Sequence, residues 1–250
     1  MSSRLRALSL AITRSYVRDK LTLFFTFAFP LIFLVIFGLL YGHDSVNGGH
    51  VIDYTATGVM AWGVANAALF GVAYTLMHWR QSEVLRLIRM TPTPLFTVLS
   101  SRFLVAVVVA LAQAVFFIGI AVLPVFGLHV SSGAALALPV LLVGVAAFFA
   151  LGLLVGTHAT SSEAIGAIGN CIILPMAFLS GTFVPISQSP RWMQDISWAL
   201  PLRYLVSGTG GLITGTGGAS SIVVPVLALT GFTLLFGGVA TRFFRWSGEA

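Results

Sequence analysis

Six stretches of the chain consist almost entirely of apolar residues, and short polar segments separate them. Each stretch has about 20 residues, the length that an α-helix needs to cross roughly 30 Å of hydrocarbon. The six predicted spans are Leu21–Tyr41, Ala56–Met77, Phe103–Leu123, Leu136–Gly156, Ile165–Val184 and Ile222–Thr241. The pattern predicts an all-α, polytopic membrane protein that forms one domain over residues 1–250.

Composition supports the membrane assignment. The chain is 58% hydrophobic and 8% charged, and its mean hydropathy is +1.00. A soluble domain carries about 25% charged residues, so a water-facing surface cannot be built from so few charges. The one cysteine, Cys171, lies inside a predicted span, which excludes a disulfide framework and a cysteine-rich metal site. We expect no metal or cofactor in this chain.

The basic residues predict the orientation. With the N-terminus in the cytoplasm, the inner segments hold eleven of the 13 Lys and Arg residues, and the outer segments hold only Arg191 and Arg203. Such a bias is typical of multi-pass proteins, whose basic loops stay inside. Both termini are therefore expected on the inner side of the cytoplasmic membrane. The net charge of +6 then reflects topology and contact with anionic lipid headgroups, and it does not indicate nucleic-acid binding.

Two inner segments have helical apolar spacing. In residues 1–20, Leu5, Leu8 and Ile12 recur along one face while the arginines fall on others, which predicts an amphipathic helix in the inner interface. In residues 78–94, a short helix with an apolar side ends at the sequence Thr-Pro-Thr-Pro. This second segment is either an interfacial anchor or a docking surface for a cytoplasmic partner.

The outer stretch "SGTFVPISQSPRWMQDISWALPLRYLVSG", Ser180 to Gly208, is too polar and too broken to span a bilayer. Ser189 is a good helix cap and Pro190 fits a first turn, so a short helix is expected to begin there. Its residues Trp192, Ile196 and Leu200 would form one apolar stripe, and Pro201 would end it. Residues 181–208 are thus predicted to dip into the outer leaflet as short re-entrant helices, buried against protein where the backbone is irregular.

The glycine-rich run "GTGGLITGTGG", Gly208 to Gly218, superficially resembles a phosphate-binding loop. A P-loop requires a lysine after its glycines, and the one lysine of this chain is Lys20. The chain therefore does not bind ATP by that route, and we expect the glycine run to be a flexible outer loop. The sequence also contains no H-E-x-x-H or G-x-S-x-G motif, so no enzymatic activity is expected.

Small and polar residues inside the spans have two interpretations each. Gly152-Leu-Leu-Val-Gly156 permits close helix approach, which favours packing within the chain over association of subunits. Asn66, Gln113 and Asn170 are either structural, bonding across helices, or line a substrate path. No span centre carries a charged residue, which argues against a proton- or sodium-coupled transporter.

This layout resembles the permease subunit of type-2 ABC exporters, the family of daunorubicin-resistance and polysaccharide-export permeases. The inner sequence "SEVLRLIRMTPTP" is similar to the coupling helix of that family, although Val84 stands where the family usually has glycine. The outer stretch is similar to its most recognisable part. The matching outer residues are Ser180, Gly181, Pro185, Ser187, Pro190, Trp192, Ile196, Ser197, Leu200, Pro201, Leu202 and Tyr204.

The resemblance implies residue roles. Coupling to an ATPase subunit would involve Glu83, Arg86, Leu87, Arg89, Thr91 and Pro92. The outer gate of the transport path would involve Pro185, Pro190, Trp192, Ile196, Leu200, Pro201 and Tyr204.

The resemblance also implies a function and its partners. Two permease chains, identical or paralogous, would pair with two separately encoded nucleotide-binding subunits that bind ATP and Mg²⁺. The expected cargo is an amphipathic drug, antibiotic or lipid-like molecule that leaves the cell. A polysaccharide or glycolipid is the alternative cargo, and a membrane anchor or assembly factor that transports nothing is the alternative from another class. Arginine outnumbers lysine twelve to one, which is typical of a GC-rich bacterial genome.

Overall fold

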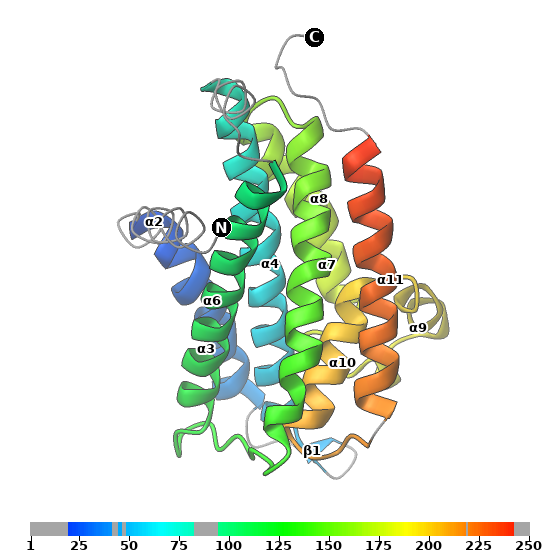
Figure 1. The fold of residues 1–250 in the computed structure, drawn as a ribbon. Coiled ribbons are helices and arrows are strands. Elements are labelled where there is room, and N and C mark those ends of the chain that lie inside the picture. The colour runs from blue at the N-terminus through cyan, green and yellow to red at the C-terminus, as the bar shows by residue number, and fades with distance from the viewer. Residues whose placement is uncertain (1–19, 42–44, 47–48, 83–94, 219, 243–250) are drawn as a thin grey trace.

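The computed structural model describes residues 20–41, 45–46, 49–82, 95–218 and 220–242, most of which are helical and run along one bundle axis (Figure 1). The first helix is continuous through α2 Lys20–Leu23, the π-helix η1 Phe24–Ala28 and α3 Phe29–Tyr41. The long helices that follow are α4 Val51–Gln81, α6 Leu95–Ala121, α7 Ala137–His158, α8 Ser162–Leu179 and α11 Ser220–Arg242. The shorter elements are β1 Ser45–Val46, β2 Gly49–His50, the 3-10 helices η2 Ala134–Leu136 and η3 Ile186–Gln188, and the helices α9 Arg191–Ser197 and α10 Pro201–Ile213.

Among the described residues, α4, α6, α7, α8 and α11 are long and apolar enough to cross a membrane. The first predicted span is present as a shorter apolar helix over Thr26–Leu40. The paired strands β1 and β2 have only two residues each, so the predicted all-α, polytopic fold is confirmed. The interfacial helix predicted for residues 1–20 lies outside the described residues except for Lys20.

Helix α4 lies at the centre of the bundle, where α3, α6, α7, α8 and α10 all pack against it. The α4–α7 contact depends on two glycines. A Cβ atom on Gly152 would lie 2.3 Å from the Leu69 carbonyl oxygen, and one on Gly156 would lie 3.0 Å from the backbone of Ala73. The predicted role of these glycines in packing within the chain is therefore confirmed.

Pro30 explains why the first helix contains a π segment. Proline has no N–H to donate to the carbonyl four residues earlier, and its ring crowds that turn. The turn before it widens, so that the N–H of Phe29 donates to Phe24 O. The freed carbonyl of Thr26 accepts a 2.8 Å hydrogen bond from Nε2 of Gln113, which is fully buried on α6. Gly63 leaves room for this bond, because a Cβ atom there would lie 2.6 Å from Gln113 Nε2.

The fifth span is shorter than predicted. Ser161 caps its beginning by accepting a hydrogen bond from the N–H of Ala164, and the helix ends at Leu179 rather than near Val184. The physical reason is Gly181, whose φ of 75° lies in the left-handed region, where glycine pays no steric cost. The chain therefore turns away from the α8 axis four residues before Pro185.

The re-entrant helices are present, with two differences from the prediction. Pro190, not Ser189, occupies the N-cap position of α9, and no side chain caps that end. Pro201 does not end a helix: α9 ends at Ser197, and Pro201 is the first residue of α10, where its missing N–H costs nothing. Figure 1 shows α10 in the half of the bundle that contains β1, where it packs against α4, α7 and α11.

The glycine run is not simply a flexible loop, so that prediction was wrong for its first half. Gly208 to Ile213 form the last turns of α10, and several of their side chains are buried. A Cβ atom on Gly208 would lie 2.8 Å from Val140 of α7 and 2.9 Å from Pro225 of α11. The glycines at this place therefore permit close helix packing, as in other membrane bundles.

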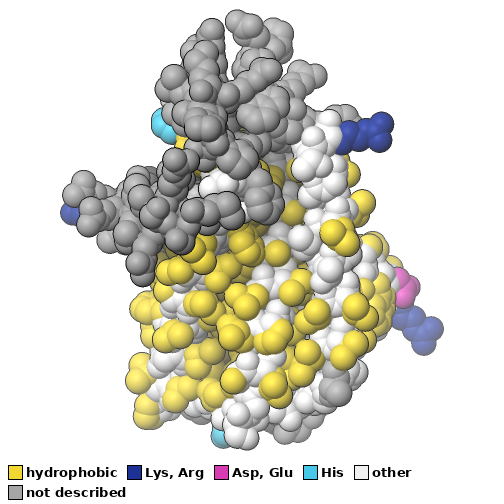
Figure 2. All heavy atoms as spheres, in the orientation of Figure 1, with side chains coloured by type: hydrophobic (Ala, Val, Ile, Leu, Met, Phe, Trp, Pro, Cys, Tyr) yellow, Lys and Arg dark blue, Asp and Glu magenta, His cyan; other side chains and the backbone are white. Residues whose placement is uncertain are grey.

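The described surface matches a lipid environment. Figure 2 shows hydrophobic side chains over most of the described part of one face, whereas charged side chains of that part appear only at the periphery of the view. Exposed apolar residues lie on every long peripheral helix, for example Val115 on α6, Phe178 on α8 and Leu234 on α11. Hydrocarbon is the solvent in which such a surface is stable.

The α4–α7 contact gives a stability prediction. We expect Gly152→Ala to lower the thermal midpoint of the purified protein, because the new methyl group meets backbone atoms that cannot move separately; overpacking of this kind costs about 1–3 kcal/mol. Gly237→Ala on α11 is the matched control, since it is the same change in a helix and nothing lies within 4 Å of the new Cβ atom. Thermal unfolding in detergent, followed by size-exclusion chromatography, compares the two, and equal midpoints would contradict the packing assignment.

Candidate functional site

The predicted coupling segment links α4 to α6. Its residues Glu83, Arg86, Leu87, Arg89, Thr91 and Pro92 lie outside the described residues, so their role stays a prediction. The helices on either side are described, however. Gln81 ends α4 and Leu95 begins α6, so any force on the segment acts directly on these two helices.

Two arginines connect the ends of α4, α6 and α7 beside this segment. Arg102 of α6 is buried and donates from its guanidinium to Gly71 O at 2.6 Å and to Thr75 Oγ1 at 3.1 Å, both on α4. Arg80 of α4 donates to Thr157 O at 2.7 Å and to Ala159 O, at the carboxyl end of α7. A cation at a helix C-terminus also interacts favourably with the helix dipole. The charge pattern of the sequence predicts only a topology role for both arginines.

At the opposite end, the loop after α8 crosses α4 at very short range. A Cβ atom on Gly58 would lie 2.1 Å from the carbonyl oxygen of Thr182, so only glycine permits this crossing. One turn away on α4, the hydroxyl of Tyr54 donates a hydrogen bond to Gly181 O. These two contacts hold the start of the outer segment against the central helix.

The side chain that this crossing directs into the bundle is Phe183. It is buried at the centre of an aromatic cluster, with ring centroids 5.4 Å from Phe37, 5.7 Å from Phe33 and 5.7 Å from Trp62. Phe178, in the last turn of α8, is 5.3 Å away. The cluster therefore joins α3, α4 and α8 with the outer segment. Phe183 is not among the predicted site residues, although its position two residues after Gly181, where the chain leaves α8, is a usable signal.

The predicted apolar stripe does not form a seal within this chain. Trp192 is 59% exposed and Ile196 is 46% exposed, whereas the one buried residue of α9 is Ser197. Leu200 is partly buried against the core. The stripe residues Trp192 and Ile196 thus face away from the core, and their assignment to the outer gate stays a prediction.

The other predicted gate residues fix the path of the outer segment. Pro185 precedes η3, Pro190 precedes α9, and Pro201 begins α10. The hydroxyl of Tyr204 donates to Trp198 O at 2.8 Å, and its ring lies 6.2 Å from that of Phe232 on α11. These four residues therefore shape and anchor the segment within this chain, and their assignment to the outer gate stays a prediction.

Arg203, in the first turn of α10, fastens α9 to α10. Its guanidinium donates to Gln194 O at 3.1 Å and to the hydroxyl of Ser197, and its Cζ atom lies 3.7 Å from the ring centre of Trp198. A cation over the face of a tryptophan is attracted by the ring quadrupole. The two short helices are therefore joined through one positive side chain.

The three amides of the predicted substrate path do not lie together. Gln113 is structural, because it satisfies the carbonyl freed by Pro30. Asn66 donates to Trp62 O within its own helix at 2.9 Å. It shares a face of α4 with Trp62 and Phe70, and Phe70 contacts Gly169 on α8, next to the exposed Asn170. Asn66 and Asn170 thus flank the α4–α8 contact on the inner side of the aromatic cluster.

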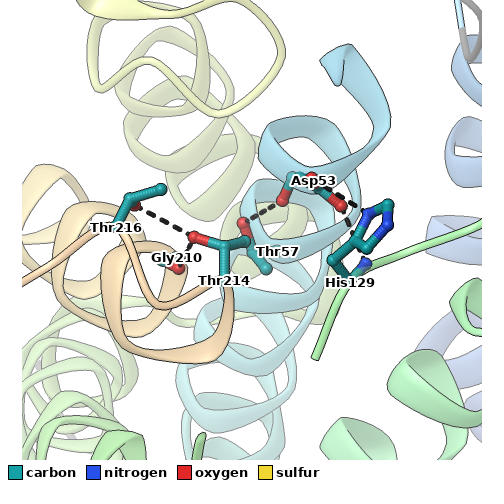
Figure 3. Close-up of polar contacts among 6 residues, drawn as sticks. All are labelled: Asp53, Thr57, His129, Gly210, Thr214 and Thr216. Atoms are coloured by element: carbon teal, nitrogen blue, oxygen red, sulfur yellow. Dashed lines mark hydrogen bonds and ion pairs between the residues drawn. The ribbon is translucent and has the colours of Figure 1, made fainter. Parts of the chain in front are cut away.

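Polar side chains lie at the beginning of α4 and beside the end of α10 (Figure 3). Asp53, in the first turn of α4, accepts a 3.0 Å hydrogen bond from the backbone N–H of His129, whose Nδ1 lies 3.7 Å from the same carboxylate. Thr57 Oγ1 donates to Asp53 O and lies 3.1 Å from the place of a Cβ atom on Gly210. This polar layer therefore joins the first turn of α4 to the loop that contains His129. The described residues contain no group of three or more potential metal ligands.

The comparisons with known proteins address the whole arrangement. Residues 4–214 match the sequence model of the family described as ABC-2 type transporter, and no curated protein matches the chain. The match covers the first apolar helix, the coupling segment, the arginine-connected helices and the outer segment through α10. Members of this family are permease domains that lack an ATPase site of their own and associate with ATPase subunits. A match over most of its length, together with five described helices that are long and apolar enough to cross a membrane, shows that this multi-pass membrane protein belongs to the ABC-2 type transporter family.

Proposed function

We propose that the chain is the permease of an ATP-driven exporter that moves an amphipathic drug, antibiotic or lipid-like molecule out across the cytoplasmic membrane. One observation carries the proposal: α4 runs without interruption from the coupling segment to the aromatic cluster. Its 31 residues correspond to about 46 Å, well beyond the roughly 30 Å of a hydrocarbon core. A displacement at its inner end therefore reaches its outer end directly.

The proposed cycle uses the contacts at both ends of α4. Two nucleotide-binding subunits, with ATP and Mg²⁺, close and press on residues 78–94 of two permease chains. Arg102 and Arg80 tie the neighbouring helices to α4, so the inner ends move as a unit. That motion strains the contacts of Gly58 and Trp62 with the outer segment, and the aromatic cluster opens to release the cargo.

The nature of the cluster supports an amphipathic cargo. Its rings lie against one another rather than presenting free faces on which sugars could stack, and the described spans offer few polar side chains to a hydrated chain. The experiments below distinguish the proposal from its two alternatives. In one the cargo is a polysaccharide or glycolipid, and in the other the chain is a membrane anchor that transports nothing.

The orientation is tested by cysteine labelling in a Cys171→Ala background. We expect cysteines at Ser187 and Thr216, both exposed and both in segments predicted to lie outside, to react with an impermeant thiol reagent in intact cells. Cysteines at Ser82 and Ser162, exposed in segments predicted to lie inside, should react only after the membrane is permeabilised. Labelling of Ser82 in intact cells would overturn the proposed orientation.

The coupling role is tested by charge reversal. We expect Glu83→Arg to leave expression and insertion unchanged but to reduce co-purification with the ATPase subunit at least about tenfold, because reversing a charge at a docking surface costs several kcal/mol. Asp195→Arg, the same reversal at an exposed residue of α9 outside the coupling segment, is the control and should retain the ATPase. If Glu83→Arg retains full coupled transport, Glu83 has no part in coupling.

The outer closure is tested at Phe183. Removing a buried phenyl ring costs about 3–5 kcal/mol of local packing, so Phe183→Ala should insert normally while export per ATP hydrolysed falls severalfold. Phe116→Ala on α6 removes the same ring from a partly exposed position outside the cluster and should leave that ratio unchanged. Export and ATP turnover are measured together in liposomes that contain the ATPase partner. A wild-type ratio in Phe183→Ala would refute the closure, and no export of any amphipathic probe by the wild-type complex would favour the anchor.

A further inference from the structure

A cavity of about 230 Å³ lies between α4, α6, α7 and α10, on the side of the bundle away from the aromatic cluster. It belongs to no site described above. Its lining consists of Met60, Leu111, Ala114, Val115, Ile118, Ala134, Ala135, Ala137, Leu138, Leu141, Thr209 and Ile213. Its one polar side chain, Thr209, donates its hydroxyl to Leu205 O inside α10 at 2.7 Å, so the wall offers a ligand no free donor there.

The cavity has a buried floor and an exposed rim. Met60, Leu141 and Ile213 are at most 5% exposed, whereas Val115 is 73% exposed and Leu138 is 45% exposed. The rim residues are apolar and lie on the outer surfaces of α6 and α7, which are membrane-crossing helices. The opening therefore faces hydrocarbon and not water.

The depth of the cavity matches one leaflet. At its shallow end lie Ala134 and Ala135 of η2 and Ile213, the last residue of α10. At its deep end lies Leu111, ten residues before the outer end of α6 at Ala121, a distance of about 15 Å along the helix. Half of a hydrocarbon core is also roughly 15 Å thick. The cavity thus extends from the outer interface to the middle of the bilayer.

An empty space of this kind is unfavourable, because its lining atoms lose dispersion contacts on one side. Water does not enter an apolar cavity to replace those contacts. An apolar cavity of about 150 Å³ stays dry and accepts one benzene molecule, so in proportion the present cavity holds roughly nine carbon atoms. The acyl chains of the surrounding lipids contact the rim of the cavity. Elongated shape, apolar lining and depth together favour a single unbranched chain.

We propose that this cavity is a binding site for one acyl chain of an outer-leaflet phospholipid, whose end contacts Met60. The headgroup of that lipid lies beside η2, at the level of the Asp53–His129 layer. The bound chain fills the space between α6 and α7 and supports the buried face of α10. The site does not depend on which substrate is exported, so its test is separate from those of the proposed function.

The test uses the full-length protein in vesicles of phosphatidylethanolamine and phosphatidylglycerol. A small fraction of the phospholipid carries a photoactivatable diazirine at the end of one acyl chain, and labelled peptides are identified by mass spectrometry. We expect Met60 and Leu141 to be labelled although they are buried, in addition to exposed residues such as Leu227 of α11, which report bulk lipid. A diazirine on the headgroup should not label Met60. Labelling confined to exposed residues, or labelling of Met60 by the headgroup probe, would overturn the proposal.

A filling variant provides the second arm. Ala114→Leu places about three more carbon atoms in the cavity, so labelling of Met60 should fall about tenfold, since each buried methylene contributes to binding. Ala112→Leu is the matched control on the exposed side of α6. In this variant the lipid probe should label Met60 as strongly as in the wild type. The labelling of Leu227 serves as the internal reference in each sample. Equal labelling of Met60 in both variants would show that the chain end reaches Met60 by another route, and the proposal would fail.

Discussion

At Gly58 the central helix has no side chain, and the carbonyl oxygen of Thr182 lies 2.1 Å from the place where a Cβ atom would stand. The outer half of the molecule is arranged around this crossing. Because the loop after α8 passes so close to α4, Gly181 comes within reach of the Tyr54 hydroxyl and Phe183 enters the space between α3, α4 and α8. Any side chain at residue 58 would push the loop outward and withdraw Phe183 from its aromatic neighbours.

The same helix is held equally firmly at its inner end. Arg102 is buried, and its guanidinium donates a hydrogen bond to a backbone carbonyl of α4. Removing one partner of a buried charged group is costly, because the other partner is left without a hydrogen bond. Arg80 extends this connection to the carboxyl end of α7. A helix fixed at both ends transmits a displacement instead of absorbing it. This rigidity is the property that the proposed coupling to an ATPase subunit requires.

The sequence predicted the spans and their number well, because hydropathy over about 20 residues reports directly on the cost of exposing backbone and side chains to hydrocarbon. It also located the re-entrant segment, since three prolines and a glycine cannot continue a span. It did not identify Phe183 or Arg102 as contact residues. Periodicity shows which face of a helix is apolar, but not which distant residue fills the space opposite it.

One prediction failed and another stays a prediction, for related reasons. Trp192 and Ile196 do form one apolar face of α9, yet that face is exposed, because an apolar surface in a membrane protein is stable against lipid as well as against protein. The glycine run was interpreted through its conformational freedom, whereas Gly208 serves close packing of α10 with α7 and α11. In hydrocarbon, glycine at a helix interface brings backbones together, and this use cannot be distinguished from a flexible loop without knowing the partner helix.

The re-entrant segment itself is possible only because its irregular backbone finds partners within the protein. Pro201 removes one N–H that would be unsatisfied at the start of α10, and Ile213 O, at its end, accepts a 2.7 Å hydrogen bond from Ser131 N. The last carbonyls of α9 are satisfied in turn, Gln194 O by Arg203 and Trp198 O by Tyr204. These bonds satisfy backbone groups at the ends of the two short helices. Because each of these bonds joins α9 or α10 to a neighbour, the segment would move largely as one body in the proposed opening of the bundle.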